Sequence, residues 1–154
     1  MRKKPARLSA LLGGACLLAG CASGPQTQAL APAGFDRVTV GGELRQRIER
    51  NFDRLETDYY QPDQVYWTEE QSGGWPGDKE GRTILALVLD ARASGRTPLY
   101  LDELIRRLPR ELNAKGYLGS IHEGSADEQQ LSGHGWLLRG LCEYYAWKKD
   151  PQVL

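Results

Sequence analysis

Apolar residues recur at helical spacing through most of the chain after residue 35. The first such pattern covers residues 41–57, where the apolar positions are separated by four, four and three residues: Leu44, Ile48, Phe52 and Leu55. This spacing predicts one amphipathic helix with a single apolar face. A second helix is expected from about Asp78 to Ser94. Its apolar residues follow one another almost without interruption, so we expect it to be buried on several faces.

Two further helices and the start of a fifth follow. Gly95 ends the second helix, and Thr97-Pro98 predicts the start of a third, whose apolar stripe consists of Leu101, Leu104, Ile105 and Leu108. Because only two or three residues then connect the second and third helices, an antiparallel hairpin is expected. A fourth helix is predicted from about Gln130 to Lys149, again apolar on more than one face. Asp150 and Pro151 have the residue types of an N-cap and first position, so a fifth helix is expected to start there.

These patterns predict an all-α fold. A long aromatic-rich loop covers residues 58–77, and a turn-rich segment follows Asn113. Buried helices joined by alternating short and long connections are typical of a helical toroid or solenoid. We therefore expect an incomplete (α/α) toroid of about four helices plus the start of a fifth. No strict repeat period is found, which argues against a tetratricopeptide-type solenoid.

The first 21 residues predict export and lipidation. Four basic residues precede a short apolar run, residues 8–18, and Leu18-Ala19-Gly20-Cys21 follows at once. This arrangement resembles a bacterial lipoprotein signal, in which cleavage before the cysteine exposes it for acylation. Residues 1–20 are then the signal peptide and Cys21 the lipidation site. A plain signal peptide with an incidental cysteine and a weak membrane helix are the alternatives, although the run is too short to span a bilayer.

The expected location is the bacterial cell envelope, with the lipid bilayer as a partner through Cys21. Ala22 stands at the second mature position, which by resemblance to enterobacterial sorting favours the outer membrane over the inner one. Residues 22–34 carry no charge and are rich in small and polar residues. Residues 21–34 are therefore predicted to be the lipidated cysteine and a flexible tether, and residues 35–154 the folded domain.

Charge and cysteine content narrow the function. The chain has 20 basic and 20 acidic residues, and the predicted cleavage removes four basic ones, which leaves 16 against 20. An excess of acidic residues argues against nucleic acid as a partner. Cys142 is the one cysteine left without a predicted role. It is expected to be a small buried apolar residue, because no histidine or cysteine spacing here matches a zinc site.

Two polar segments precede strongly apolar helices. Residues 74–82 include Trp75, Asp78, Glu80 and Arg82, and residues 128–140 include Glu128, Gln129, Gln130, Ser132, His134 and Trp136. Both could face the same end of a bundle. Carboxylates, amides, an imidazole and indoles are the groups that bind sugars through hydroxyl hydrogen bonds and an apolar ring platform. We therefore predict carbohydrate as the partner, with these substrate-binding residues: His134, Glu128, Asp78, Trp75 and Gln129.

A structural interpretation of the same residues stays open. Acidic residues in a first helical turn complement the helix dipole. His134 lies between Gly133 and Gly135, which suggests close approach of backbone or of a ligand, and it can equally be a satisfied structural histidine. His122, beside Glu123 in a loop, is a weaker candidate. No nucleophile elbow supports a serine triad, so no catalytic residue is predicted within the chain.

Residues 36–154 resemble the N-terminal hairpins of the β-L-arabinofuranosidase-like glycoside hydrolases, family 127 and its relatives. The resemblance is strongest from Glu128 to Leu154, where an acidic residue is followed, after five positions, by a Gly-His pair that opens a helix. The resemblance implies an (α/α)6 barrel and a sugar pocket that contains His134. Glu128 is the residue that matches the family's acidic position. The family's zinc-bound cysteine nucleophile and its catalytic glutamate lie further downstream, and Cys142 does not match that motif. No cofactor is therefore expected within this chain.

Three functions are compatible with these observations. The first is the N-terminal portion of an envelope lipoprotein related to glycoside hydrolases that act on arabinofuranosyl or similar plant-type glycans. It would supply substrate contacts without the catalytic pair, so the chain alone is expected to be inactive. The second is a non-catalytic carbohydrate-binding lipoprotein. The third is a helical scaffold for protein interaction.

Overall fold

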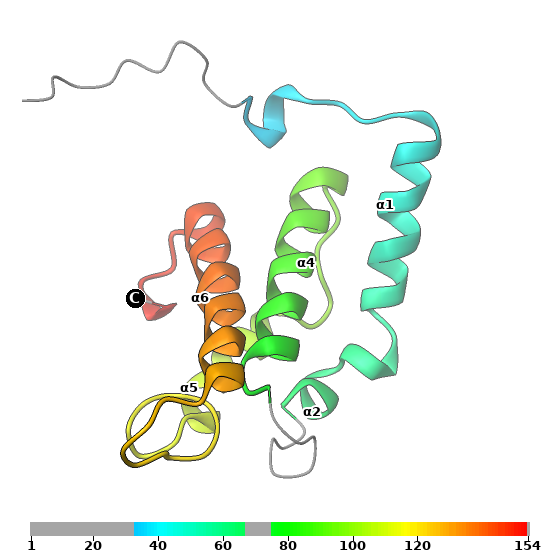
Figure 1. Ribbon diagram of the computed structural model, residues 1–154. Coiled ribbons are helices and arrows are strands. Elements are labelled where there is room, and N and C mark those ends of the chain that lie inside the picture. The colour runs from blue at the N-terminus through cyan, green and yellow to red at the C-terminus, as the bar shows by residue number, and fades with distance from the viewer. Residues whose placement is uncertain (1–32, 67–74, 154) are drawn as a thin grey trace, which may run out of the picture. The chain divides into compact units, whose positions relative to one another are not determined.

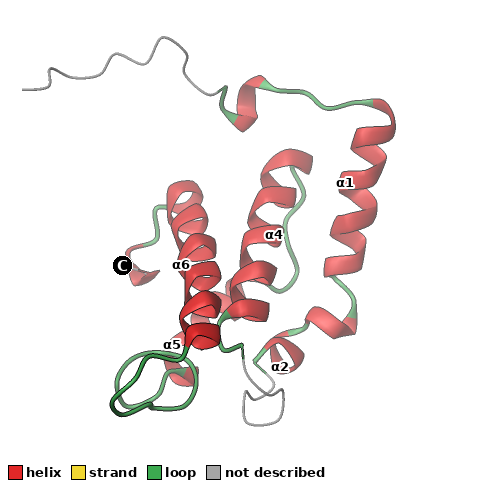
Figure 2. Cartoon of the chain, in the orientation of Figure 1, coloured by secondary structure: helices red, strands yellow, loops and turns green. Residues whose placement is uncertain are grey.

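The computed structural model describes residues 33–66 and 75–153, which consist of helices and loops without a strand (Figures 1 and 2). The all-α prediction is confirmed. The helices are α1 (Gly42–Leu55), α2 (Pro62–Val65), α4 (Asp78–Ser94), α5 (Leu101–Glu111) and α6 (Glu128–Lys148), with three 3-10 turns, η1 (Phe35–Arg37), η2 (Asp58–Tyr60) and η3 (Pro151–Val153). The predicted signal peptide, Cys21 and nearly all of the tether lie outside the described residues, as does part of the 58–77 loop. No helix in the described ranges is long and apolar enough to cross a membrane.

Helices α4 and α6 lie side by side and run in the same direction (Figure 1). Gly77 lies against the Gly133 backbone, Gly81 against Leu137, and Gly140 against the Gly81 carbonyl oxygen and the backbone of Leu85. The contacts therefore advance along both helices together. Glycine is needed at these positions because any side chain would keep the two backbones apart.

The core forms around this helix pair. Side chains from α1, α2, α4, α5 and α6, together with Tyr66 just after α2 and the loop residue Leu118, share one apolar cluster. On α4 the buried residues are Glu80, Gly81, Thr83, Ile84, Leu85, Leu87, Val88 and Ala91. The expectation that this helix is buried on several faces is confirmed.

Thr83 on α4 has a hydroxyl group that is buried in the core. It is 2% exposed, and its Oγ1 has no hydrogen-bond partner in the described parts of the chain. A buried hydroxyl without a partner lowers stability. We expect Thr83→Val to raise the free energy of unfolding by about 1 kcal/mol, measured by urea denaturation. Thr83→Ser, which keeps the hydroxyl and removes a methyl group, should lower it, and a destabilised valine variant would contradict this interpretation.

Helix α1 contacts α4 through the C-terminal half of its apolar face and through ion pairs. Phe52 and Leu55 are buried, whereas Leu44 at the start of the predicted stripe is 58% exposed. Arg96, just after α4, forms two ion pairs with α1 and its C-cap: Nη1 lies 2.6 Å from Asp53 Oδ1, and Nη2 lies 3.1 Å from Glu56 Oε2. The same guanidinium lies 4.1 Å from the centre of the Phe52 ring. The polar contacts thus hold the end of α1 that the core also buries.

The boundary predicted for the third helix needs correction. The third helix begins at Leu101, and six residues rather than two or three connect it to α4. Gly95 ends α4 in a left-handed conformation, and a residue before proline, here Thr97, is disfavoured in a helix. The chain therefore stays non-helical until α5 begins. Beyond α6, Asp150 Oδ1 accepts a hydrogen bond from Gln152 N at 2.9 Å, as a cap does, and the helical turn η3 follows at Pro151–Val153, where the start of a fifth helix was expected.

Cys142 is exposed, so the prediction of a buried cysteine is wrong. It lies on α6, which is apolar on two faces, and the core covers only the face that carries Leu137 and Tyr144. The fourth helix itself is confirmed, although it starts two residues earlier than expected because Asp127 caps it. Asp127 Oδ1 accepts a hydrogen bond from Gln130 N at 2.8 Å. Closure into a toroid stays a prediction.

Candidate functional site

The two polar segments of the sequence lie next to each other, as expected. Pro76 packs against Gly119 and Gly133, and the Arg82 guanidinium lies 4.5 Å from the centre of the Trp136 ring. This juxtaposition follows from the parallel pairing of α4 and α6, because two parallel helices bring their N-termini to the same end. The candidate residues of both segments are therefore neighbours in space.

At the α4 end, the candidates already have structural contacts. Asp78 Oδ1 accepts a hydrogen bond from Arg82 Nε at 2.8 Å, one turn further along the helix. Lys79 Nζ donates to the Gln64 carbonyl at 2.8 Å, and burial lowers the pKa of Lys79 while nearby Glu80 raises it. Trp75 is 50% exposed. The Lys79 contact ties α2 to the start of α4, and the Trp75 indole stays accessible.

His134 contacts the backbone with both ring nitrogens. Nδ1 lies 2.6 Å from the Gln130 carbonyl oxygen, and Nε2 accepts a hydrogen bond from Leu118 N at 3.1 Å. A carbonyl oxygen only accepts, so the hydrogen must be on Nδ1 and the free lone pair on Nε2. The ring is half-buried and lies edge-on to Tyr117, with ring centres 5.9 Å apart. A ligand would therefore meet the edge of this ring and not an unpaired nitrogen.

Gln130 binds the backbone of the same residue, Leu118, through its carbonyl group. Its side-chain amide donates to the Leu118 carbonyl at 2.7 Å and to the Ser120 carbonyl at 3.1 Å, and the residue is 6% exposed. Gln130 and His134, one turn apart on α6, thus bind both polar groups of the Leu118 residue. We call this pair the Leu118 clamp. It fixes the 113–127 loop on the start of α6.

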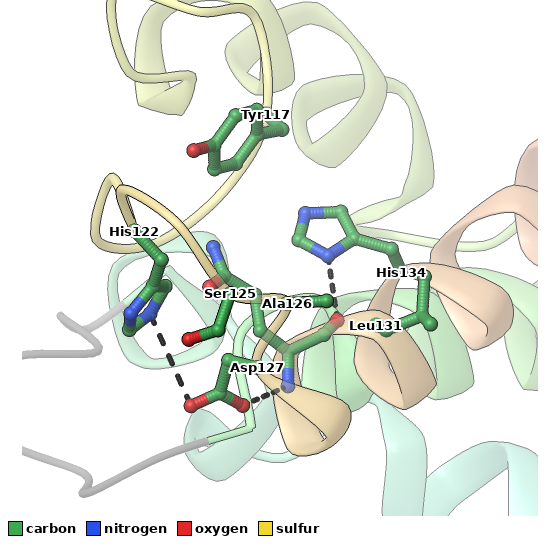
Figure 3. Close-up of a pocket in the computed structure, with 8 residues that line it drawn as sticks. Tyr117, His122, Ser125, Ala126, Asp127, Leu131 and His134 are labelled. Atoms are coloured by element: carbon green, nitrogen blue, oxygen red, sulfur yellow. Dashed lines mark hydrogen bonds and ion pairs between the residues drawn. The ribbon is translucent and has the colours of Figure 1, made fainter.

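A pocket of about 240 Å³ lies between this loop and α6 (Figure 3). It is lined by Tyr117, His122, Ser125, Ala126, Asp127, Gln130, Leu131 and His134. His122 Nε2 lies 3.9 Å from Asp127 Oδ2, and both side chains are partly exposed. Hydrogen-bond donors and acceptors therefore line the same pocket as the aromatic ring of Tyr117.

The pocket contains one of the five predicted binding residues. His134 lines it, whereas Trp75, Asp78, Glu128 and Gln129 do not belong to its lining, and the last two are exposed on α6. Sequence reasoning did not select Tyr117, Ser125 or Asp127, and it ranked His122 low. The sequence marks these residues only as part of a turn-rich segment that precedes a helix. Such a pattern does not reveal which loop side chains come together in space.

The chemistry of the pocket favours binding over nucleophilic attack. Ser125, His122 and Asp127 are the residue types of a hydrolytic triad. Within the described residues, however, no hydrogen bond joins Ser125 to His122, and Asp127 Oδ1 is already used to cap α6. No group of three or more histidine, cysteine or acidic side chains that could hold a metal ion is found in the described ranges.

Comparisons of the chain with protein-family models, with curated proteins and with solved structures give no match. The glycoside hydrolase resemblance therefore stays a prediction.

Proposed function

We propose that this chain binds a carbohydrate in the pocket between the 113–127 loop and α6, on an envelope protein anchored through Cys21. One observation supports this above all. The Tyr117 ring and the His122 and Asp127 pair line the same pocket, on a segment that the Leu118 clamp holds in place. An aromatic ring for the apolar face of a sugar and nearby donors and acceptors for its hydroxyls are the usual elements of such a site.

The size of the pocket limits what enters it. Sites for drug-sized ligands hold about 300–1,000 Å³, and this one holds about 240 Å³. One sugar residue at the end or side of a glycan is therefore the proposed occupant, with the rest of the glycan outside. The resemblance of residues 128–154 to arabinofuranosidase-like hydrolases supports a pentofuranosyl unit of a plant-type glycan.

Binding without hydrolysis is the activity proposed for the described residues. Glycosidases place two carboxyl groups on opposite sides of the scissile bond. Asp127 is the only carboxylate that lines the pocket in the described part of the chain. The resemblance leaves room for a larger enzyme that completes the site, and in that case this pocket would supply substrate contacts.

Titration of the purified full chain in detergent with arabinofuranosyl oligosaccharides, followed by calorimetry, tests the proposal. Asp127→Asn keeps a residue that caps helices well and removes the charge. Tyr117→Ala removes the ring. Each is expected to weaken binding about tenfold, which corresponds to about 1.4 kcal/mol. Glu128→Gln, an equal charge change on an exposed neighbour outside the pocket, should leave the affinity unchanged.

A helical interaction scaffold is the second candidate, and one observation favours it. The Leu118 clamp accounts for Gln130 and His134 without any ligand. Saturable sugar binding that Asp127→Asn weakens would exclude a purely structural role for the pocket. A folded chain that binds none of the arabinose-, galactose- or glucose-containing oligosaccharides would support the scaffold and contradict our proposal.

A further inference from the structure

The outward face of α6 carries a second apolar stripe. Leu131, Gly135, Leu138 and Cys142 are separated by four, three and four residues, which is the spacing of a coiled-coil seam. Leu131 is 67% and Leu138 is 64% exposed. A side chain built at Gly135 would meet nothing within 4 Å, so the surface has a notch between the two leucines.

The stripe is complementary to itself in the antiparallel direction. Consider α6 of a second copy placed antiparallel, with the two-fold axis of the pair passing between residues 136 and 137 of each helix. In this register Leu138 of each copy faces Gly135 of the other. Leu131 then faces Cys142. Each large side chain thus meets a small residue, which is how knobs and holes alternate in a paired helix interface. A parallel pairing would instead place the large residues opposite each other and the two glycines opposite each other.

The charged residues at the two ends of α6 also favour the antiparallel orientation. Helix α6 starts at Asp127 and Glu128 and ends at Lys148 and Lys149. An antiparallel arrangement brings the acidic end of one helix near the basic end of the other, and it also opposes the two helix dipoles. In a parallel pair, like charges would lie together at both ends, which is unfavourable.

We propose that two copies of this chain associate through antiparallel pairing of their α6 helices, with Leu131 and Leu138 of each copy covered by the other. The pairing uses the face opposite to the core and does not depend on carbohydrate binding. Leu131 also borders the pocket, so the pair would carry its two pockets near opposite ends of the joined helices.

Disulfide trapping in the full chain tests the pairing and its direction. In the antiparallel register the two Cys142 residues lie 11 positions apart, about 16 Å along the axis at 1.5 Å per residue. This exceeds the Cα separation of about 7 Å that a disulfide tolerates. Leu131→Cys, by contrast, places a thiol opposite Cys142 of the other copy. Membranes that contain this variant, treated with a copper oxidant and analysed on non-reducing gels, should show at least tenfold more linked dimer than the unaltered chain.

Two further variants complete the test. Leu131→Cys combined with Cys142→Ser should lose the linked dimer, and a dimer that persists would overturn the antiparallel register. Leu138→Glu in the Leu131→Cys background should also abolish the link, because a charge enters the seam. Gln129→Glu, an exposed position that already lies off the seam, is the matched control. Efficient linking of the unaltered chain through Cys142, or no linking in any folded variant, would contradict the proposal.

Discussion

Gly81→Ala is expected to lower the free energy of unfolding by at least about 3 kcal/mol. The added methyl group would overlap the backbone of α6, where Leu137 Cα would lie 2.5 Å from it and the Leu137 nitrogen still closer. Backbone of a packed helix cannot rotate away as a flexible side chain does. The two helices must therefore separate, and the contacts along their whole length weaken together.

Gly135→Ala is the matched control for this prediction. It makes the same change in the interior of α6, at a position where nothing lies within 4 Å. Alanine is favoured over glycine in a helix by about 1 kcal/mol, so this variant should be more stable than the unaltered chain. Urea denaturation followed by circular dichroism, at protein concentrations too low for self-association, measures both. Equal effects of the two substitutions would contradict the close helix contact at Gly81.

Helical periodicity was sufficient to locate α1, α4 and α6 to within a few residues. Each of these helices has apolar side chains at spacings that only a helix brings to one face. The start of α5 was misplaced because Pro98 was interpreted as a helix start, whereas it lies in the non-helical connection between α4 and α5, residues 95–100. Local sequence rules give the residue types of a boundary, and tertiary packing decides where the helix begins.

Burial on α6 could not be derived from the sequence. The helix is apolar on two faces, and periodicity does not say which face another element covers. Cys142 and Gly135 lie on the open face, whereas Gly133 and Gly140 face α4. The expected close approach of backbone is therefore confirmed at Gly133, whereas at Gly135 nothing lies within 4 Å and approach of a ligand stays a prediction.

The candidate site, too, could be predicted from the sequence only in part. His134 was selected for its imidazole and its glycine neighbours, and it does line the pocket. Its contact with Leu118 joins residues 16 positions apart, and no rule of local spacing reveals such a pair. The loop residues Tyr117 and Asp127 converge for the same reason, because the clamp decides where their loop lies. Whether His134 also contacts a ligand stays a prediction.

Gln130→Ala is the second large effect that we expect, a loss of about 2–3 kcal/mol in the free energy of unfolding. The substitution removes two hydrogen bonds and leaves the Leu118 carbonyl without its side-chain partner beside a residue that is 2% exposed. Gln129→Ala, at the exposed neighbouring position, is the control and should change stability by less than about 0.5 kcal/mol. Thermal and urea denaturation of the three chains measure the difference.

The clamp makes a stronger prediction for the double variant. Gln130 and His134 hold the same Leu118 residue from its two sides, so once one contact is lost the loop moves and the other contact loses most of its value. We expect the effects of Gln130→Ala and His134→Ala to combine to at least about 1 kcal/mol less than their sum, as coupled neighbours do. Strict additivity would mean that the two side chains act on the loop independently. Amide exchange at Leu118 should accelerate in both single variants and remain unchanged in Gln129→Ala, because only the clamp residues protect that N–H.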